Sequence, residues 1–184
     1  PDYRGYAGRV AGGVLRVGDE IMVLPSGLTS TITGIDSPTG PLQEATPGQA
    51  VTVLLADDLS ITRGDMICRP NNRPRVSQEL EAMLCWMDDT APLQPGKIYS
   101  IKHTTKVART KITEVLYRLN ISTLSRETGV NQLAMNEIGR VTLHTTAPLM
   151  FDDYHQNRTT GCFIIVDEAT GQTAGAGMLL SPRT

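Results

Sequence analysis

The sequence predicts an all-β protein made of two tandem small antiparallel β-barrels. Short runs of apolar and β-branched residues recur about every 8–12 residues, which is typical of barrels and sandwiches. Glycine and proline separate these runs, and no helical period of apolar residues is visible in the first 68 positions. A polar, proline-rich stretch divides the chain into two halves. Closed barrels are favoured over open sheets because closure removes unpaired strand edges.

The first half contains four well-delimited strand candidates. Several of them follow turn residues such as Gly18, Pro47 and Gly64, because glycine and proline supply backbone angles that other residues resist. The candidates are rich in β-branched side chains, which suit a pleated sheet. The expected strands are 20–24, 29–35, 49–55 and 66–68.

The stretch 69–75 has the composition of a connector. It reads Arg-Pro-Asn-Asn-Arg-Pro-Arg and holds no apolar side chain. Its arginines leave a basic contact point open as an alternative, although composition favours a solvated linker. We therefore expect a first barrel at 1–70, a linker at 71–75 and a second barrel at 76–184.

The second half repeats the β pattern. The expected strands are 80–87, 97–102, 111–119, 139–145, 161–166 and 173–179. For 80–87 a helix is the alternative, but the short length and the flanking turn residues favour a strand. In the fourth of these, Val141 and Leu143 should share one face, with Arg140 and His144 on the other, because strand side chains alternate. The run 161–166 is continuously apolar, which predicts a strand buried on both faces. Residues 122–137 are expected to form a loop with at most one or two short turns.

The composition is that of an ordinary globular protein. Apolar residues make up 40 %, charged residues 20 %, and the net charge is −2. These values exclude the disordered class and disfavour a dedicated nucleic-acid binder. No run reaches the roughly 20 apolar residues of a membrane span. Cys68, Cys85 and Cys162 lie in apolar surroundings, so we expect reduced, structural thiols and a cytoplasmic protein.

Motifs for catalysis are missing. A phosphate-binding loop needs two glycines, a lysine and a hydroxyl at fixed spacing, because backbone amides must wrap the phosphates. The nearest segment, 94–98, lacks the first glycine and the hydroxyl. His103, His144 and His155 are not spaced as metal ligands, so a surface or hydrogen-bonding role is expected. We expect no catalytic residue, no metal site and no bound cofactor in this chain.

The chain carries motifs of a known GTPase superfamily. The run Gly-Arg-Val-x-x-Gly with Gly-Asp-x-Ile, inside 4–27, resembles the second domain of translation-factor GTPases, as do 47–51 and 61–67. Finer motifs are similar to the large subunit of bacterial sulfate adenylyltransferase, also called ATP sulfurylase. They include 2–8, 23–27, 136–141, 153–161 and 175–178. The resemblance covers essentially the whole chain and implies barrels like domains 2 and 3 of elongation factor Tu.

The resemblance also implies a function. The family's large subunit hydrolyses GTP and pairs with a small catalytic subunit, making adenylylsulfate from ATP and sulfate for sulfate assimilation and cysteine biosynthesis. GTP and magnesium would be bound by a GTPase domain expected ahead of Pro1. The expected partners are the small subunit, that GTPase domain and, in some bacteria, a fused adenylylsulfate kinase. The chain alone is expected to be a non-catalytic scaffold, without membrane or nucleic-acid partners.

One segment is a candidate interface. Polar and aromatic residues gather between two expected strands at 152–161, and we hypothesise that Tyr154, Asn157 and Arg158 contact the GTPase domain or the small subunit. A solvated loop whose asparagine and glycine only form turns is an equally good interpretation. A rival function is a transfer-RNA-binding fragment of an elongation factor, for which salt-sensitive RNA affinity would speak.

Overall fold

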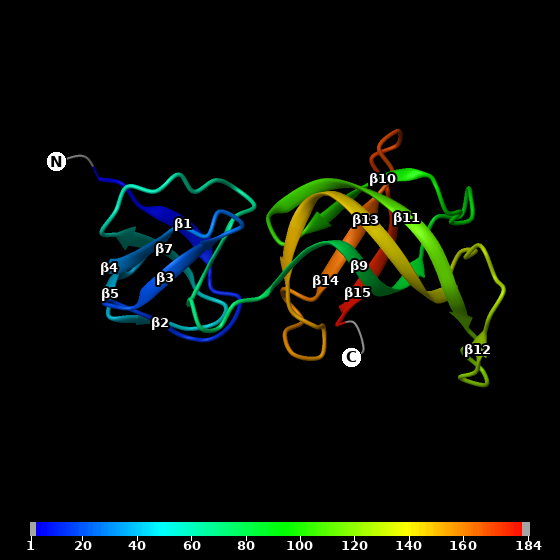
Figure 1. The fold of residues 1–184 in the computed structure, drawn as a ribbon, viewed down its shortest axis with the longest axis horizontal. Coiled ribbons are helices and arrows are strands. Elements are labelled where there is room, and N and C mark those ends of the chain that lie inside the picture. The colour runs from blue at the N-terminus through cyan, green and yellow to red at the C-terminus, as the bar shows by residue number, and fades with distance from the viewer. Residues whose placement is uncertain (1–2, 182–184) are drawn as a thin grey trace. The chain divides into compact units, whose positions relative to one another are not determined.

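The computed structural model describes residues 3–181, and in that range it contains strands and no helix. The chain divides into two compact units, the first ending at Pro74 and the second starting at Arg75 (Figure 1). The first strand of the second unit begins at Arg75, the last residue of the predicted linker.

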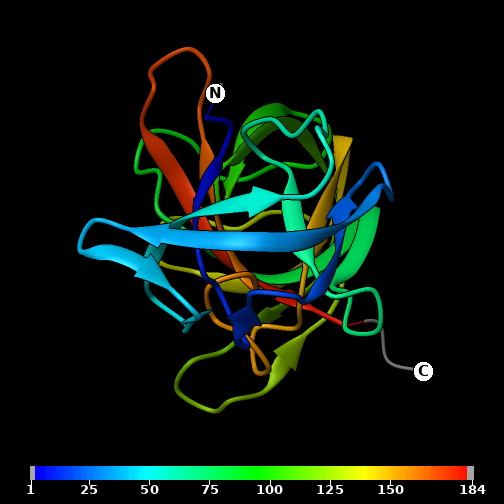
Figure 2. The ribbon, with the colours of Figure 1, turned by 90° about the vertical axis from the view of Figure 1, so that its left-hand side faces the viewer.

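The first unit holds eight short strands (Figures 1 and 2, blue to cyan). Their bounds are β1 Tyr6–Arg9, β2 Leu15–Arg16, β3 Glu20–Leu24, β4 Thr29–Ser37, β5 Gly40–Leu42, β6 Glu44–Ala45, β7 Ala50–Leu55 and β8 Met66–Cys68. The main sheet has the order β1-β7-β4-β3-β8 with β5 added to β4, and β2 pairs with β6. Their inward side chains form a core that includes Ile21, Val23, Ile32, Ile35 and Val53.

The sequence of β4 explains how this small core is built. Ser30 and Ile32 are buried while Thr31 and Thr33 are exposed, as alternation along a strand requires. A register shift at Gly34 then inserts one residue, so that Ile35 points inward again. Such a bulge bends the strand, which allows a short sheet to wrap around its own core.

The second unit holds seven strands. Their bounds are β9 Arg75–Trp86, β10 Ile98–His103, β11 Lys106–Leu119, β12 Arg126–Glu127, β13 Ile138–Phe151, β14 Cys162–Val166 and β15 Thr173–Leu180. The order is β10-β14-β15-β9-β13-β11, and β10 also pairs with β11, which closes the ring. Every pairing in both units is antiparallel. The prediction of an all-β protein made of two tandem small antiparallel β-barrels is confirmed.

The imperfect alternation of β11 has a structural cause. Its pairing with β13 shifts between Ile112 and Glu114, and again between Val115 and Tyr117. Each shift is a bulge that breaks the two-residue period and increases the local twist. Beyond the bulges, β11 pairs with the two-residue strand β12, which lies in the segment 122–137 that was predicted as a loop with short turns.

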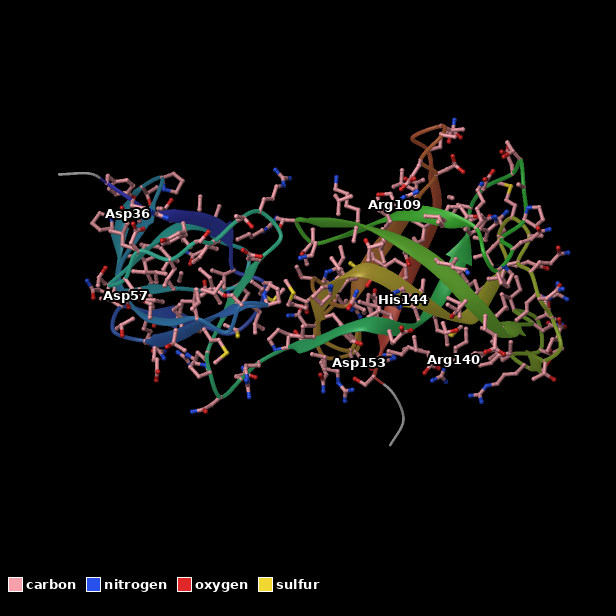
Figure 3. The ribbon with its side chains drawn as sticks, turned by 45° about the horizontal axis from the view of Figure 1, so that its top comes forward. Asp36, Asp57, Arg109, Arg140, His144 and Asp153 are labelled. Atoms are coloured by element: carbon pink, nitrogen blue, oxygen red, sulfur yellow. The ribbon has the colours of Figure 1, made fainter. Side chains whose placement is uncertain are left out.

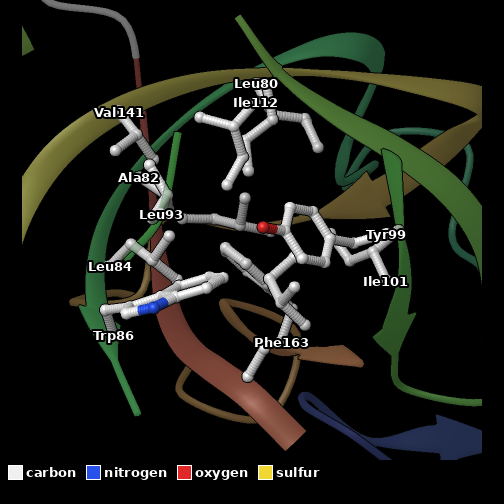
Figure 4. Packing of buried hydrophobic residues seen from close by; sticks show 14 of the residues in the cluster. Leu80, Ala82, Leu84, Trp86, Leu93, Tyr99, Ile101, Ile112, Val141 and Phe163 are labelled. Carbon is white, nitrogen blue, oxygen red and sulfur yellow. The ribbon is translucent and has the colours of Figure 1, made fainter. Parts of the chain in front are cut away.

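The core of the second barrel is larger and aromatic (Figure 4). Trp86 and Tyr99 are each 1 % exposed and meet edge to face, with ring centroids 5.5 Å apart. The indole nitrogen of Trp86 donates a hydrogen bond to the carbonyl of Ala91 at 2.8 Å, so its polar atom is satisfied inside the barrel. Phe163 enters the same core over Gly177, where any side chain would meet the phenyl ring.

The prediction for 161–166 was wrong in one respect. Phe163 and Ile165 are buried, but Cys162 is exposed and Ile164 is partly exposed, so β14 buries only one face. The cause is barrel closure: a strand in a closed sheet has one face toward the core and one toward the outside. An unbroken apolar run therefore placed apolar side chains on the outer surface.

The hairpin between β14 and β15 is fastened by Asp167. Its carboxylate accepts a hydrogen bond from Nζ of Lys97 at 2.8 Å and from the amides of Ala169 and Thr170 at 2.9 and 3.1 Å. Lys97 and these amides together lower the pKa of Asp167 to about 2. Because the folded pKa lies below the unfolded one, this stabilisation is complete above about pH 4 and is lost as the pH falls toward 2.

We expect Asp167→Asn to lower the melting temperature of the second unit at pH 7 and to flatten its acid transition between about pH 4 and pH 2. Circular dichroism melts at several pH values measure both effects. Asp89→Asn, at an exposed aspartate of the same unit, is the matched control. An acid transition that is the same in Asp167→Asn and the parent chain would contradict this account.

Candidate functional site

The segment 152–161 joins β13 to β14 as a compact series of turns held by its own polar groups. Oδ2 of Asp153 accepts a hydrogen bond from the amide of Ser181 at 2.8 Å, and Oδ1 accepts one from the amide of His155 at 2.9 Å. These donors, Ser181 first, lower the pKa of the Asp153 carboxyl. The charged carboxylate therefore ties the segment to the residue that follows β15.

The three residues predicted to form an interface have different tasks. The guanidinium carbon of Arg158 lies 5.9 Å from the ring centroid of Tyr154, so these side chains meet at the surface. The side-chain oxygen of Asn157 accepts hydrogen bonds from the amides of Thr159 and Thr160 at 3.0 and 3.4 Å. Asn157 thus shapes the turn, and Tyr154 and Arg158 present its outer surface.

The segment 152–161 is also hydrogen-bonded to two strands of the barrel. His103, 1 % exposed, donates from Nε2 to the carbonyl of Thr160 at 2.6 Å. The Thr160 hydroxyl donates to Asp152 at 2.7 Å, and the amide of Leu179 donates to the carbonyl of Gly161 at 2.7 Å. The segment is therefore held by β10 and β15 at once. The expected hydrogen-bonding role of this histidine is confirmed.

The anchor at His103 predicts a pH dependence. Burial is the larger influence and lowers the pKa of His103, although the Thr160 carbonyl acts against it. Because the folded pKa lies below the unfolded value of about 6.5, the unfolded chain binds the proton more readily, and stability falls as the pH drops below that value. We expect urea unfolding of the second unit to show this loss between about pH 7 and pH 5. His103→Asn should flatten the dependence, whereas the exposed control His155→Asn should keep it.

Beside this segment lies an open hollow of about 450 Å³. Tyr154 lines it from the segment, Lys102 from β10, Cys162 and Ile164 from β14, and Met178 from β15. Its lining is mostly apolar, which is unusual for the outer surface of a small barrel.

The strand register shows that the apolar surface continues beyond the hollow. Paired residues of neighbouring strands lie on the same face of an antiparallel sheet. One outward row contains Cys162, Met178 and Met83, and the next contains Ile164, Ala176 and Cys85. We call these six residues the apolar strip. The sequence did not indicate this strip, because the continuous apolar run of β14 predicts burial on both faces.

All three cysteines are free, but the burial on which the expectation of structural thiols rested does not hold for Cys162. Cys68 is buried and Cys85 is partly buried, but Cys162 is exposed and lines the hollow. The cause is again the single buried face of β14. An apolar sequence context indicates a strand, but it does not say on which side of the barrel a given residue lies.

Other polar groups of the barrel surface are paired with one another. On the outer face of β9 and β13, Arg140 forms an ion pair with Glu81, and Nδ1 of His144 is hydrogen-bonded to the carboxylate of Glu79. Figure 3 labels Arg140 and His144. Within residues 3–181, no group of three or more His, Cys, Asp or Glu side chains is placed to bind a metal ion. In the same range no helix is long and apolar enough to cross a membrane.

Two antiparallel barrels in this order define the class of β-barrel domains found in translation-factor GTPases. Residues 79–180 match the GTP-eEF1A C-terminal domain-like family, and residues 6–68 match elongation factor Tu domain 2. The chain therefore belongs to the family of β-barrel domains of translation-factor GTPases.

The more particular resemblance to sulfate adenylyltransferase is confirmed. The chain is 52 % identical to the bifunctional enzyme CysN/CysC of Mycobacterium tuberculosis, covering 97 % of this chain and 29 % of that protein. It is 44 % identical to sulfate adenylyltransferase subunit 1 of Aeromonas hydrophila, again over 97 % of this chain but only 37 % of the relative. The chain thus spans about a third of these relatives. The solved structure of sup35 complexed with GDP has a TM-score of 0.87 at 16 % identity, over 98 % of this chain and 46 % of that one, which shows the fold alone.

Proposed function

We propose that this chain is the non-catalytic C-terminal part of the GTPase subunit of sulfate adenylyltransferase. It supports GTP-driven formation of adenylylsulfate from ATP and sulfate, in the cytoplasm, by scaffolding and by binding partners. The observation that carries the proposal is the 44 % identity to sulfate adenylyltransferase subunit 1 over 97 % of the chain. GTP and magnesium are bound by the GTPase domain of the parent subunit, not by these barrels.

The shape of the barrels supports a scaffolding role. GTPase switches change a few loops, so they need a stiff body against which the loops can reorient and a partner that responds. The closed ring of the second unit supplies such a body, because each of its six strands is hydrogen-bonded on both sides. The proposed partners are the small catalytic subunit, the GTPase domain of the parent chain and, where it is fused, an adenylylsulfate kinase domain.

The net charge of −2 weighs against the transfer-RNA-binding alternative, because nucleic-acid binders usually carry a basic surplus. Seven basic side chains pair with carboxylates within the chain, namely Arg4, Arg16, Arg69, Lys97, Arg109, Arg118 and Arg140. Side chains neutralised in this way add little to phosphate binding, which depends on displacing counterions.

The proposal is tested by calorimetric titration of the 184-residue chain with the purified small subunit of sulfate adenylyltransferase. Saturable binding is expected. An assay of the chain alone for adenylylsulfate formation should read zero, and turnover by the chain alone would overturn the non-catalytic assignment. Absence of binding would overturn the partner-binding role of the barrels, while salt-sensitive transfer-RNA affinity would favour the alternative.

A further inference from the structure

The apolar strip is the least explained surface of the second barrel. In a small barrel, outward residues are normally polar because they face water. Here two neighbouring outward rows, each with one residue from β14, β15 and β9, are sulfur-containing or aliphatic, whereas Glu79 and Glu81 follow on the same face of β9. Met178 is 37 % exposed and Cys162 is exposed as well, although the barrel gains no core packing from either side chain. Contiguous exposed apolar surface of this kind marks interaction sites.

The hollow, which four of the six residues of the apolar strip line, has a firm wall. Tyr154 belongs to the segment 152–161, which is fixed by hydrogen bonds to His103 and Leu179. At Gly161 the backbone of the segment passes so close to itself that a Cβ would lie 2.7 Å from the carbonyl oxygen of Asn157. A hollow with a fixed wall can receive a side chain at little cost in ordering.

The charges at the hollow indicate what it receives. Lys102 lines it, and Arg158 lies against its wall residue Tyr154. Neither cation forms an ion pair within residues 3–181, where seven of the sixteen lysine and arginine side chains do. The carboxylates of Asp152 and Asp153 accept hydrogen bonds from their own segment and its anchors. The cations therefore point to an acidic partner.

We propose that the hollow is a docking site for an acidic segment of a protein partner. One apolar side chain of that segment enters the hollow against Ile164 and Met178, and its carboxylates pair with Lys102 and Arg158. The proposal rests on the proposed function, since the partner is the small catalytic subunit. It adds the surface and the chemistry by which the two proteins meet.

The test compares two charge-reversal pairs in calorimetric titrations with the small subunit. Lys102→Glu with Arg158→Glu changes the hollow. Lys111→Glu with Arg126→Glu is the matched control, because both residues are exposed on the same unit and Arg126 lies over Tyr117 much as Arg158 lies over Tyr154. We expect at least a tenfold increase in Kd for the hollow pair and less than a twofold change for the control. Melting curves verify that both variants fold.

A second readout locates the contact independently of charge. Cys162 is exposed whereas Cys68 is buried and Cys85 partly buried, so iodoacetamide followed by peptide mass spectrometry, which resolves the three cysteines, can follow the alkylation of Cys162. A saturating amount of small subunit should slow alkylation of Cys162 at least fivefold.

The outcomes separate the two proposals. Tight binding by the parent chain, with equal Kd values for both variant pairs or with Cys162 unprotected, overturns the docking site and leaves the proposed function standing. Equal weakening by both pairs also overturns the site, because it shows a general effect of net charge. Absence of binding by the parent chain overturns the partner role and the docking site together.

Discussion

Replacing Trp86 by alanine should lower the free energy of unfolding of the second unit by about 3–5 kcal/mol, the range for large aromatic side chains in closed cores. Trp86 is 1 % exposed, stacks edge to face on Tyr99 and donates a hydrogen bond to Ala91. Truncation leaves a cavity inside the closed barrel. Because each of the six barrel strands is hydrogen-bonded on both sides, the barrel cannot contract to fill it.

Urea unfolding followed by circular dichroism measures this loss, because Trp86 is the only tryptophan and its fluorescence disappears with it. Met87→Ala is the control at the neighbouring position, where the side chain is 47 % exposed. Surface changes of that kind usually cost less than about 0.5 kcal/mol. A loss below about 1 kcal/mol for Trp86→Ala would show that the aromatic cluster is not the main support of this barrel.

The second large effect is expected at Gly161. A Cβ there would lie 2.4 Å from Cα of Tyr154 and 2.7 Å from the carbonyl oxygen of Asn157, and these are backbone atoms that no rotamer change can move. Gly161→Ala should therefore destabilise the second unit by about 1–3 kcal/mol, as overpacking does in tight sites. Because Tyr154 forms the wall of the hollow, the variant should also bind the small subunit less tightly.

Gly8→Ala is the control for this substitution. Gly8 lies in β1, and a Cβ there meets nothing within 4 Å. It should leave the melting temperature nearly unchanged. A Gly161→Ala variant as stable as the parent chain would mean that the turns of 152–161 can shift, and the rigid wall of the hollow would then be wrong.

Much of the fold could be predicted because strands and turns are encoded locally. Turn glycines and prolines separate the strands, and β13 alternates as expected, with Val141 and Leu143 buried and His144 exposed. The strand at 80–87 was also predicted, although it starts earlier, at Arg75. Strand ends depend on which neighbour continues the hydrogen bonding, and that neighbour lies far away in the sequence.

The candidate site was predicted only in part. The polarity and turn residues of 152–161 identified Tyr154, Asn157 and Arg158, but they did not distinguish the turn-forming role of Asn157 from exposure of the other two. Lys102 and Met178 gave no local signal, because they belong to strands that are neighbours of the segment only after the barrel closes.

The sequence by itself determined the all-β class, the positions of most strands and the family, because short-range turn chemistry, alternation and family motifs are written along the chain. Only the tertiary structure decided which face of each strand is buried in the second barrel. Ring closure gives β14 an outer face, and it places Cys162, Met178 and Met83 side by side, although they are up to 95 positions apart in the sequence. The apolar strip, and the position of Lys102 beside the hollow, are therefore consequences of ring closure.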